Sequence, residues 1–596
     1  MSQQNNNAMQ KHFYRASAAD FSKIPGNQIA YWLGATATNA FSGKAIGDVL
    51  TFKQGIATSD NNRFLRLWHE VDLFKIDFSC SSHHELKVSG LKWFPYNKGG
   101  SYRKWFGNNE IIVNWENDGK EMKDFTSTLP QGTHVRLKSR EYYCLPCITY
   151  TALSSGNFGC RISDAGFLFD TKGSCIFGNS EEISTYAGLL NSKAAKVFLD
   201  ALCPSLDYSM VGIKQVPVLN GFNNENAMLV DKCVKISRSD WDFFELSWGF
   251  TRALLLHLDY CQSTLKVSYQ QLRAHWFDIT LEMQRIEEDN NRLFIESYGL
   301  QEGLTPDVPL NEITLTCNPH YRYGGNLTDE EREARLQSDT IAELISYAIG
   351  CMMGRYSLDR EGLVYAHAGN EGFKALVEEG AYATFAADED GILPLTADNW
   401  FPDDVAARFE QFVRTVWDAE TLEENLQFIA DSLCLAAIKP VKKGGETARE
   451  TIRRYLSTQF FKDHMKTYKK RPIYWLFSSG KEKAFECLVY LHRYNESTLP
   501  RMRTEYVTPL LGQMAGRIER KRLEQAEADT AGAKRIGKDI DSLTKQLTEL
   551  RAFDDELKHH ADMRITLDLD DGVKVNYGKF GSLLSEVKAI TGDKGE

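Results

Sequence analysis

Residues 58–63 form a run of short polar side chains that ends in an arginine. The run contains Thr58, Asn61, Asn62 and Arg63. Asparagine and arginine are the side chains that pair through two hydrogen bonds with the edges of adenine and guanine. The same run is also typical of an Asx turn followed by a surface arginine. DNA reading and a structural turn therefore both remain open.

A second stretch, residues 92–104, alternates cations with aromatic rings. It contains the cations Lys92, Lys98, Arg103 and Lys104 and, between them, the aromatic residues Trp93, Phe94, Tyr96 and Tyr102. Cations at this density bind phosphates, and aromatic rings form rigid walls or stack on bases. Gly99 and Gly100 allow a tight loop close to a ligand. A β-hairpin with buried rings and solvated lysines would give the same pattern.

Residues 149–178 supply a third set of polar side chains. This set comprises Ser154, Ser155, Asn157, Arg161 and Lys172. Two short apolar runs follow and end at Gly173 and Gly178. As with the first run, base contacts and turn chemistry are alternative interpretations.

The elements that position these residues follow from the pattern of apolar side chains. Residues 46–220 have short aromatic and β-branched runs with glycine and asparagine turns between them, which predicts an α+β domain with short strands. Helices are predicted from Trp241 onward, with Ser239 or Asp240 as the N-cap, and over residues 330–356. Residues 446–510 are predicted to be mostly helical.

The C-terminal part carries a coiled-coil signature. Its apolar residues recur at alternating spacings of four and three at Ile536, Ile540, Leu543, Leu547 and Leu550. This spacing predicts two paired helices, with a break at residues 528–533. The last segment, residues 565–584, is predicted to be a short strand-turn unit.

Four segments together, residues 54–72, 91–119, 149–178 and 189–219, resemble the target-recognition domain of the PglX family. These are adenine-specific DNA methyltransferases of bacteriophage-exclusion (BREX) systems. The resemblance covers nearly the whole chain and implies the C-terminal half of such a protein. It implies an α+β fold class: a mixed α/β target-recognition domain followed by a mainly helical C-terminal region with a coiled-coil helix pair.

The resemblance also implies a division into four parts. These are a connector from a missing catalytic domain at 1–45, the target-recognition domain at 46–220, an acidic and mainly helical domain at 221–440, and a basic helical region with the coiled coil and the strand-turn unit at 441–596. The expected function is recognition of a double-stranded DNA site for adenine-N6 methylation in the bacterial cytoplasm. The DNA-binding residues expected from it are Thr58, Asn61, Asn62, Arg63, Lys92, Lys98, Arg103, Lys104, Ser154, Ser155, Asn157, Arg161 and Lys172.

The chemistry of methyl transfer is not apparent in this sequence. Adenine-N6 methylation needs a glycine-rich loop for S-adenosylmethionine and an Asn-Pro-Pro-Tyr type of loop that holds the flipped adenine. The nearest match to the second loop is Asn318-Pro319-His320-Tyr321, which more often marks a simple turn. We therefore predict no catalytic or cofactor-binding residue in this chain, and S-adenosylmethionine bound by the missing catalytic half. Cys144 and Cys147 are a single pair, so no metal site is predicted.

Charge and composition limit the class of protein. The net charge is −11, but residues 1–220 and 439–521 carry net charges of +4 and +11 around an acidic stretch, residues 221–438, at −22. A local basic surface can hold phosphates because charge effects are screened over about 8 Å at physiological salt. The 12 scattered cysteines and the absence of a long apolar run predict a reduced, cytoplasmic protein without a membrane span.

Several partners are expected. Double-stranded DNA and the missing methyltransferase domain are the main ones, and other BREX proteins and phage inhibitors that mimic DNA are implied by the resemblance. An alternative function from another class is a stand-alone scaffold of a defence complex, which would use the acidic region and the coiled coil without reading sequence.

Overall fold

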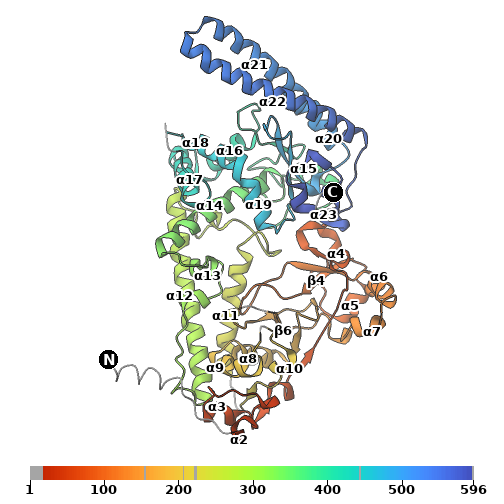
Figure 1. The fold of residues 1–596 in the computed structure, drawn as a ribbon, viewed down its shortest axis with the longest axis vertical. Coiled ribbons are helices and arrows are strands. Elements are labelled where there is room, and N and C mark those ends of the chain that lie inside the picture. Colours follow the sequence, from red (N-terminus) through yellow and green to blue (C-terminus); the bar gives the residue numbers. More distant parts are fainter. Residues whose placement is uncertain (1–17, 154–155, 206, 220–223, 442–444, 593–596) are drawn as a thin grey trace. The chain divides into compact units, whose positions relative to one another are not determined.

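The chain divides into two units, and each is assembled from segments that are far apart in the sequence (Figure 1). The computed structural model describes residues 18–153, 156–205, 207–219, 224–441 and 445–592. Unit 1 comprises the described residues up to Leu65, together with Lys75–Trp241 and His275–Gly325. Unit 2 comprises Arg66–Phe74, Asp242–Ala274 and the described residues from Asn326 onward. Helices make up 54% of the structure and strands make up 9%, which confirms the α+β class.

Unit 1 contains several small sheets (Figure 1). One has the antiparallel order β2 (Thr51–Lys53), β9 (Cys175–Phe177), β6 (Cys147–Tyr150), β7 (Cys160–Ser163). In a second, β4 (Trp93–Asn97) lies between the antiparallel β5 (Ile111–Asn114) and the parallel β8 (Leu168–Phe169). The short β1 (Lys44–Ala45) pairs with β10 (Pro217–Val218), and β3 (Leu65–Leu67) begins at the end of the first segment of unit 1.

The core of unit 1 explains why its strands read as continuous apolar runs. All five residues of β4 and all four of β6 are buried. A strand that is covered on both faces does not alternate between apolar and polar residues. The core packs large aromatic side chains from the strands and from the loops between them, among them Phe64, Phe94, Tyr96, Trp115, Tyr143 and Phe169.

Helices surround these sheets. The helices of unit 1 are α2 (Ala18–Phe21), α3 (Ala35–Ala40), α4 (Asn61–Phe64), α5 (His83–Val88), α6 (Glu116–Ser127), α7 (Gly132–Arg136), α8 (Ser180–Leu190), α9 (Lys193–Leu202), α10 (Met210–Ile213), α11 (Asn224–Asp242), α13 (Pro319–Arg322) and, from His275 onward, α12 (Leu265–Ser297). Local capping fixes where several of them begin. In α8, for example, Asn179 and Glu182 form a reciprocal capping box.

The expected helix start at Trp241 is wrong. Ser239, Asp240 and Trp241 belong to the last turn of α11, which ends at Asp242. Asp240 does not cap a following helix, because its carboxylate accepts hydrogen bonds from the backbone N–H groups of Thr316 and Cys317 at 2.7 and 2.9 Å. The loop that contains Thr316 and Cys317 therefore occupies the carboxylate oxygens that an N-cap would use.

Unit 2 is mainly helical. The predicted long helix at 330–356 corresponds to α14 (Asp329–Met352), which Thr328 and Glu331 start with a capping box. The other helices of its body are α15 (Phe373–Glu378), α16 (Val405–Trp417), α17 (Leu422–Ala436), α18 (Ala448–Tyr455), α19 (Phe461–Thr467), α20 (Thr498–Arg501), α23 (Gly572–Gly578) and α24 (Val587–Thr591). Helices α18 and α19, and likewise α20 and α21, are joined by short π-helical stretches.

A three-stranded antiparallel sheet lies within the region that was expected to be mostly helical. Strand β13 (Glu486–Tyr490) is central, with β11 (Ile392–Pro394) on one side and β12 (Tyr474–Ser478) on the other. Strands β12 and β13 form a hairpin, closed by the bond from Ser479 N–H to Phe485 C=O at 2.9 Å. Gly480, with φ of 133°, sits in the turn of this hairpin.

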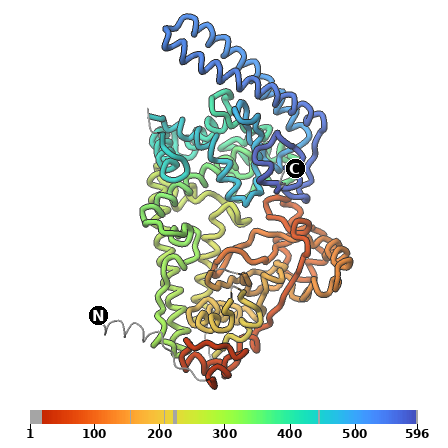
Figure 2. Tube along the Cα trace, in the orientation of Figure 1, coloured from red at the N-terminus to blue at the C-terminus, as the bar shows by residue number. Residues whose placement is uncertain are grey.

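The predicted helix pair is confirmed. Helix α21 (Thr508–Glu527) packs along α22 (Thr530–Asp562), and Asp529 caps α22 at the predicted break. Leu510, Met514 and Ile518 are buried, as are the seam residues Ile540, Leu543, Leu547 and Leu550, while Ile536 is half-buried. We call this pair the helical arm (Figures 1 and 2).

The predicted C-terminal strand-turn unit is helical instead. Val573, Val575 and Tyr577 alternate with polar residues, which suggests a strand, but they lie in α23. Val573 and Tyr577 are four residues apart and both are fully buried, whereas Val575 is 54% exposed. This exposure follows helical rather than strand periodicity.

Candidate nucleic-acid interface

Three loops that are far apart in the sequence meet in unit 1. They are residues 55–63, 97–101 and 170–173, at the ends of β4 and β8. The N–H of Ile56 donates to the carbonyl of Phe169 at 2.7 Å, and Thr171 N–H donates back to Ile56 C=O at 3.0 Å. Asp170 N–H donates to Asn97 C=O at 2.9 Å. The backbone therefore brings the first polar set identified in the sequence together with one cation from each of the other two, Lys98 and Lys172.

Two glycines make this close approach possible. A Cβ atom on Gly55 would lie 2.0 Å from the carbonyl oxygen of Phe169, and one on Gly173 would lie 2.5 Å from that of Asn97. Neither distance is compatible with a side chain, so only glycine allows the loops to pack at this spacing.

Lys98 connects the three loops through its ammonium group. Its Nζ lies 3.1 Å from Asn61 Oδ1 and 3.1 Å from Asp170 Oδ2. Thr58 Oγ1 donates to the same Asn61 oxygen at 2.6 Å, and Tyr96 Oη donates to Asp170 at 3.0 Å. The side chain of Lys98 remains 28% exposed, so a shared polar network holds a cation at the surface.

Further cations lie beside this network. Arg136 Nη1 donates to Ser59 Oγ at 2.7 Å and Nη2 to the carbonyl of Pro130 at 3.3 Å, so its described partners are neutral. Arg63 pairs with Glu121 at 2.8 Å with both side chains 45% exposed. Lys172 is 59% exposed, 3.8 Å from Asp207. Sequence reasoning missed Arg136, because nothing near residue 136 marks it as a neighbour of residues 58–63.

The loop surface is our name for the exposed or half-buried polar residues of these loops together with Arg136. Its members are Ser59, Asn61, Asn62, Arg63, Lys98, Arg136 and Lys172. Thr58, also expected to contact DNA, is buried beneath it and 3% exposed. Asp60 caps the short helix α4, accepting from Arg63 N–H at 3.1 Å, so an Asx turn and a possible DNA surface coincide at residues 58–63.

Other expected residues lie elsewhere. Lys92 precedes β4 while Lys98 follows it, so the strand separates them by roughly 16–20 Å. Asn157 Nδ2 donates to Glu312 at 3.3 Å and is half-buried. Ser154 and Ser155 lie outside the described residues.

Arg103, Lys104 and Arg161 lie inside unit 1, not on a surface. They are 5%, 4% and 2% exposed. Lys104 pairs with Glu287 of α12; burial lowers its pKa, but Glu287, Tyr102 and Glu312 together outweigh burial and the pKa ends above its usual value. Burial lowers the pKa of Arg161 to about 10. The cation-rich sequence predicted that these residues contact phosphates. Arg103 and Lys104 instead form buried ion pairs with Asp240 and Glu287. None of the three residues is part of the loop surface.

The Asn318-Pro319-His320-Tyr321 motif forms the start of the short helix α13. Asn318 is fully buried, and its Nδ2 donates to the carbonyls of Leu310 and Ile313 at 2.7 and 2.8 Å. Its Oδ1 accepts from His320 N–H at 3.1 Å. The amide is therefore used by its own backbone, which is the chemistry of a structural turn.

The second basic region also has internal partners. Arg493 is 1% exposed and donates to the carbonyls of Asp388 and Glu389 at 2.7 and 2.8 Å. Arg501 pairs with Glu505, and Arg503 with Asp554, each at 2.8 Å. Lys469 and Lys470 are exposed.

The described residues also bear on metal binding and on membrane insertion. Within the described parts of the chain, no group of three or more His, Cys, Asp or Glu side chains could hold a metal ion. The Sγ atom of Cys144 lies 3.5 Å from that of Cys80, and both thiols are free. No described helix is long and apolar enough to cross a membrane.

Comparison with known proteins gives the clearest functional evidence. The chain is 49% identical over 582 residues to the adenine-specific methyltransferase BrxX of Escherichia coli O9:H4 (strain HS), covering 97% of this chain and 46% of that protein. The chain is homologous to adenine-specific methyltransferases. It is also 37% identical over 585 residues to the adenine-specific methyltransferase PglX of Lacticaseibacillus casei (strain Zhang), covering 95% of this chain and 45% of that protein. The chain thus spans less than half the length of either relative, and no family model matches it.

Proposed function

We propose that this chain is the double-stranded DNA recognition part of an adenine-specific methyltransferase that acts in bacteriophage exclusion. The homology to two adenine-specific methyltransferases over nearly the whole chain supports the reaction class. The loop surface supports the assignment of DNA recognition to this chain. Three separate segments converge there beside Arg136 to present asparagines, two lysines and two arginines on unit 1, and this convergence is the observation that carries the proposal.

The loop surface would divide its work between phosphates and bases. Lys98 and Arg136 are the cations whose neighbours hold them in place while leaving them within reach of solvent, so they suit phosphate binding. Asn61 and Asn62 stand beside them on an exposed turn and suit hydrogen bonding to base edges. Because the network around Lys98 is formed before DNA arrives, less side-chain entropy is lost on binding.

Methyl transfer itself would need a part of the protein outside this chain. S-adenosylmethionine would bind there because this sequence shows no glycine-rich loop after a strand, and the flipped adenine would bind there because the amide of Asn318 is used by its own backbone. Purified chain mixed with duplex DNA and tritiated S-adenosylmethionine should incorporate no label. Incorporation that Asn318→Ala abolishes would assign catalysis to this chain instead.

Salt-dependent binding tests the loop surface directly. The double variant Lys98→Ala/Arg136→Ala should bind duplex DNA more weakly, and the slope of log K against log salt should fall by about two units for two lost phosphate contacts. The control Lys374→Ala/Lys462→Ala removes the same charge from exposed sites on unit 2. Equal slopes for the two double variants would contradict the proposal.

A scaffold without sequence reading is the second candidate. The acidic stretch at 221–438, with its net charge of −22, favours binding of basic proteins over DNA. Wild-type chain that fails to bind any duplex at low salt, yet remains folded, would favour this candidate.

A further inference from the structure

The outer face of the helical arm carries a row of cations. Lys534, Arg535, Lys538 and Lys545 lie in the first half of α22 and are all exposed. Among the described residues, none of the four forms an ion pair with a carboxylate. We call these four residues the arm cations.

Many arginines of the body of unit 2 have carboxylate partners. Arg449 contacts both Glu410 and Glu423, at 2.8 and 2.6 Å, and Arg454 contacts Glu446 at 2.7 Å. The arm cations differ from these arginines because no such pair joins them to a carboxylate among the described residues.

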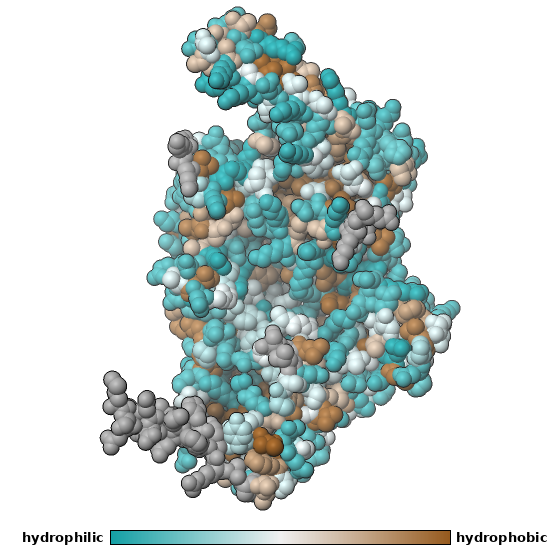
Figure 3. Space-filling model, in the orientation of Figure 1, coloured by the Kyte–Doolittle hydropathy of each residue, from teal (hydrophilic) through white to brown (hydrophobic). Residues whose placement is uncertain are grey.

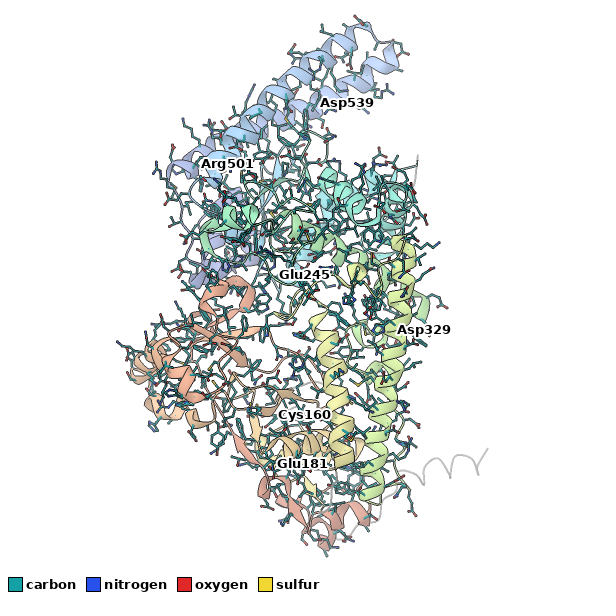
Figure 4. All side chains as sticks on the ribbon, turned by 180° about the vertical axis from the view of Figure 1, so that it is seen from behind. Cys160, Glu181, Glu245, Asp329, Arg501 and Asp539 are labelled. Carbon is teal, nitrogen blue, oxygen red and sulfur yellow. The ribbon has the colours of Figure 1, made fainter. Side chains whose placement is uncertain are left out.

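Pairs within the arm lie away from the row. Lys521 of α21 contacts Asp539 of α22 at 3.0 Å, and Arg522 contacts Glu519 on α21 itself at 2.6 Å (Figure 4). Asp539 is thus taken up by the neighbouring helix. Asp541 is the exposed carboxylate that remains along the row, so the four cations retain three net positive charges there.

Helix geometry places three of the arm cations in one line. At about 100° per residue, Lys534, Lys538 and Lys545 fall within roughly 40° of one another around α22, and Arg535 flanks them. At about 1.5 Å per residue, the line is about 16 Å long. One strand of duplex DNA carries a phosphate about every 3.4 Å along the axis but winds around it, so a straight line of this length meets the few phosphates that face it.

The arm is built to hold this line straight. On α22 the buried seam of Leu543, Leu547 and Leu550 packs against Leu510, Met514 and Ile518 of α21 beside Lys545, and the half-buried Ile536 continues the seam towards Lys534 and Lys538. Figure 3 shows hydrophilic side chains over most of the visible length of the arm, with some hydrophobic ones near its end. A rigid, polar helix with cations on its outer face suits a polyanion better than an apolar partner.

We propose that the arm cations bind the phosphate backbone of duplex DNA without reading its sequence. This inference rests on the proposed function and adds a second contact region on unit 2, distinct from the loop surface of unit 1. Charge complementarity carries it: the partner is a regular polyanion, and the row has the length and sign to meet one strand of it. An acidic protein partner is the competing occupant.

The test replaces the four arm cations and leaves the buried apolar residues of α22 unchanged. The quadruple variant converts Lys534, Arg535, Lys538 and Lys545 to Gln, which keeps helix propensity close to that of Lys and Arg. The matched control makes the same change at four exposed lysines of the body of unit 2, namely Lys266, Lys374, Lys462 and Lys466. Full-length chains are titrated with duplexes of unrelated sequence at several salt concentrations, and thermal unfolding verifies that all variants are folded.

Phosphate binding by the arm predicts a distinct outcome. The arm variant should lose roughly ten-fold or more in affinity, by a similar factor on every sequence, and its salt slope should fall by about three to four units while that of the control stays near wild type. An unchanged slope, or the same loss in arm variant and control, overturns the inference. The proposed function stands in that case if Lys98→Ala/Arg136→Ala still weakens binding, whereas wild-type chain that binds no duplex overturns both.

Discussion

Arg103 and Asp240 form an ion pair inside unit 1, with Nη1 3.3 Å from Oδ2 and side chains that are 6% and 0% exposed. Asp240 also accepts from two backbone N–H groups, and Nη2 of Arg103 donates to Thr316 Oγ1 at 2.5 Å. The guanidinium stacks 5.0 Å from the ring of Trp241. One arginine thus joins the loop after Tyr102 to the end of α11 and to the loop before α13.

Replacing Arg103 by Ala should destabilise unit 1 strongly. It leaves the buried Asp240 carboxylate without its charged partner, which costs about 3–5 kcal/mol. Denaturant titration measures the loss. Arg63→Ala, which breaks the half-exposed pair with Glu121, should cost about 1 kcal/mol or less. Similar losses for the two variants would show that Arg103 does not act as a buried anchor.

Glycine at position 55 should be required by both fold and binding. Gly55→Ala places a methyl group against the Phe169 carbonyl, and relieving that clash moves the loops at a cost of roughly 1–3 kcal/mol or more. Affinity for duplex DNA should fall as well, because moving the loops separates Lys98 from Asn61. Gly512→Ala is the control: it lies in α21 with nothing within 4 Å, and it should raise stability by about 0.5–1 kcal/mol. A Gly55→Ala chain as stable as wild type would refute the loop packing.

Glu245 should make unit 2 less stable at alkaline pH. Burial raises its pKa from 4.5 to about 7, although the nearby Arg355 opposes this (Figure 4). A carboxyl with a raised pKa contributes stability fully below pH 4.5 and loses it as the pH rises through 7, by up to about 3 kcal/mol. Glu245→Gln keeps acceptors for Tyr468 and Ser346. Glu245→Gln should remove the contribution of Glu245 to the pH dependence of the unfolding free energy between pH 5 and 8.5, measured by urea unfolding. Identical pH profiles for wild type and variant would contradict this prediction.

His464 should have the opposite effect. Burial and the nearby Arg355 lower its pKa from 6.5 to about 3. Its Nε2 accepts from the N–H groups of Ile473 and Tyr474, both at 3.1 Å, so protonation breaks two bonds. Its stability contribution is present above pH 6.5 and lost as the pH falls towards 3, by about 2 kcal/mol at pH 5.

Urea midpoints from pH 7 to 5 measure this contribution. They are best taken in the Glu245→Gln background, which removes the opposing carboxyl. Adding His464→Gln should reduce the acid limb by about 2 kcal/mol at pH 5, and the rest belongs to the buried His69 and His492, whose pKa values burial also lowers. His134→Gln, at an exposed position, should leave the limb unchanged, and an acid limb of the same size after the His464 change would contradict the prediction.

Patterns that are local in sequence were predicted well. The seam of α22 shows itself in its own spacing, and the helix predicted at 330–356 corresponds to α14, which begins at Asp329. Both depend on residues within a few turns of one another. The strand predicted in the α23 segment was wrong because its local alternation resembled a strand. The burial of its residues depends instead on packing against the rest of unit 2, which the local sequence does not show.

Burial of the cations could not be predicted, because their partners are distant. Asp240 is 137 residues after Arg103, and Glu287 is 183 residues after Lys104. A lysine destined for a buried carboxylate looks the same in sequence as one destined for solvent or phosphate. The convergence of Asn61, Lys98 and Arg136 was hidden likewise, because it arises from the pairing of β4 with β8 and from two glycine contacts.

The segment Arg66–Phe74 has a consequence for how the protein is made. Glu70 Oε2 accepts the N–H of Val573, 503 residues later, and Trp68 and Val71 are buried in unit 2 at 2% and 1% exposure. At a translation rate of about 5–20 residues per second, these side chains leave the ribosome roughly 25–100 s before Val573 is synthesised. Until then an apolar stretch of the nascent chain is without its final partner. Heterologous expression should therefore gain from slow growth or added chaperones, and truncation before residue 573 should lower the soluble yield.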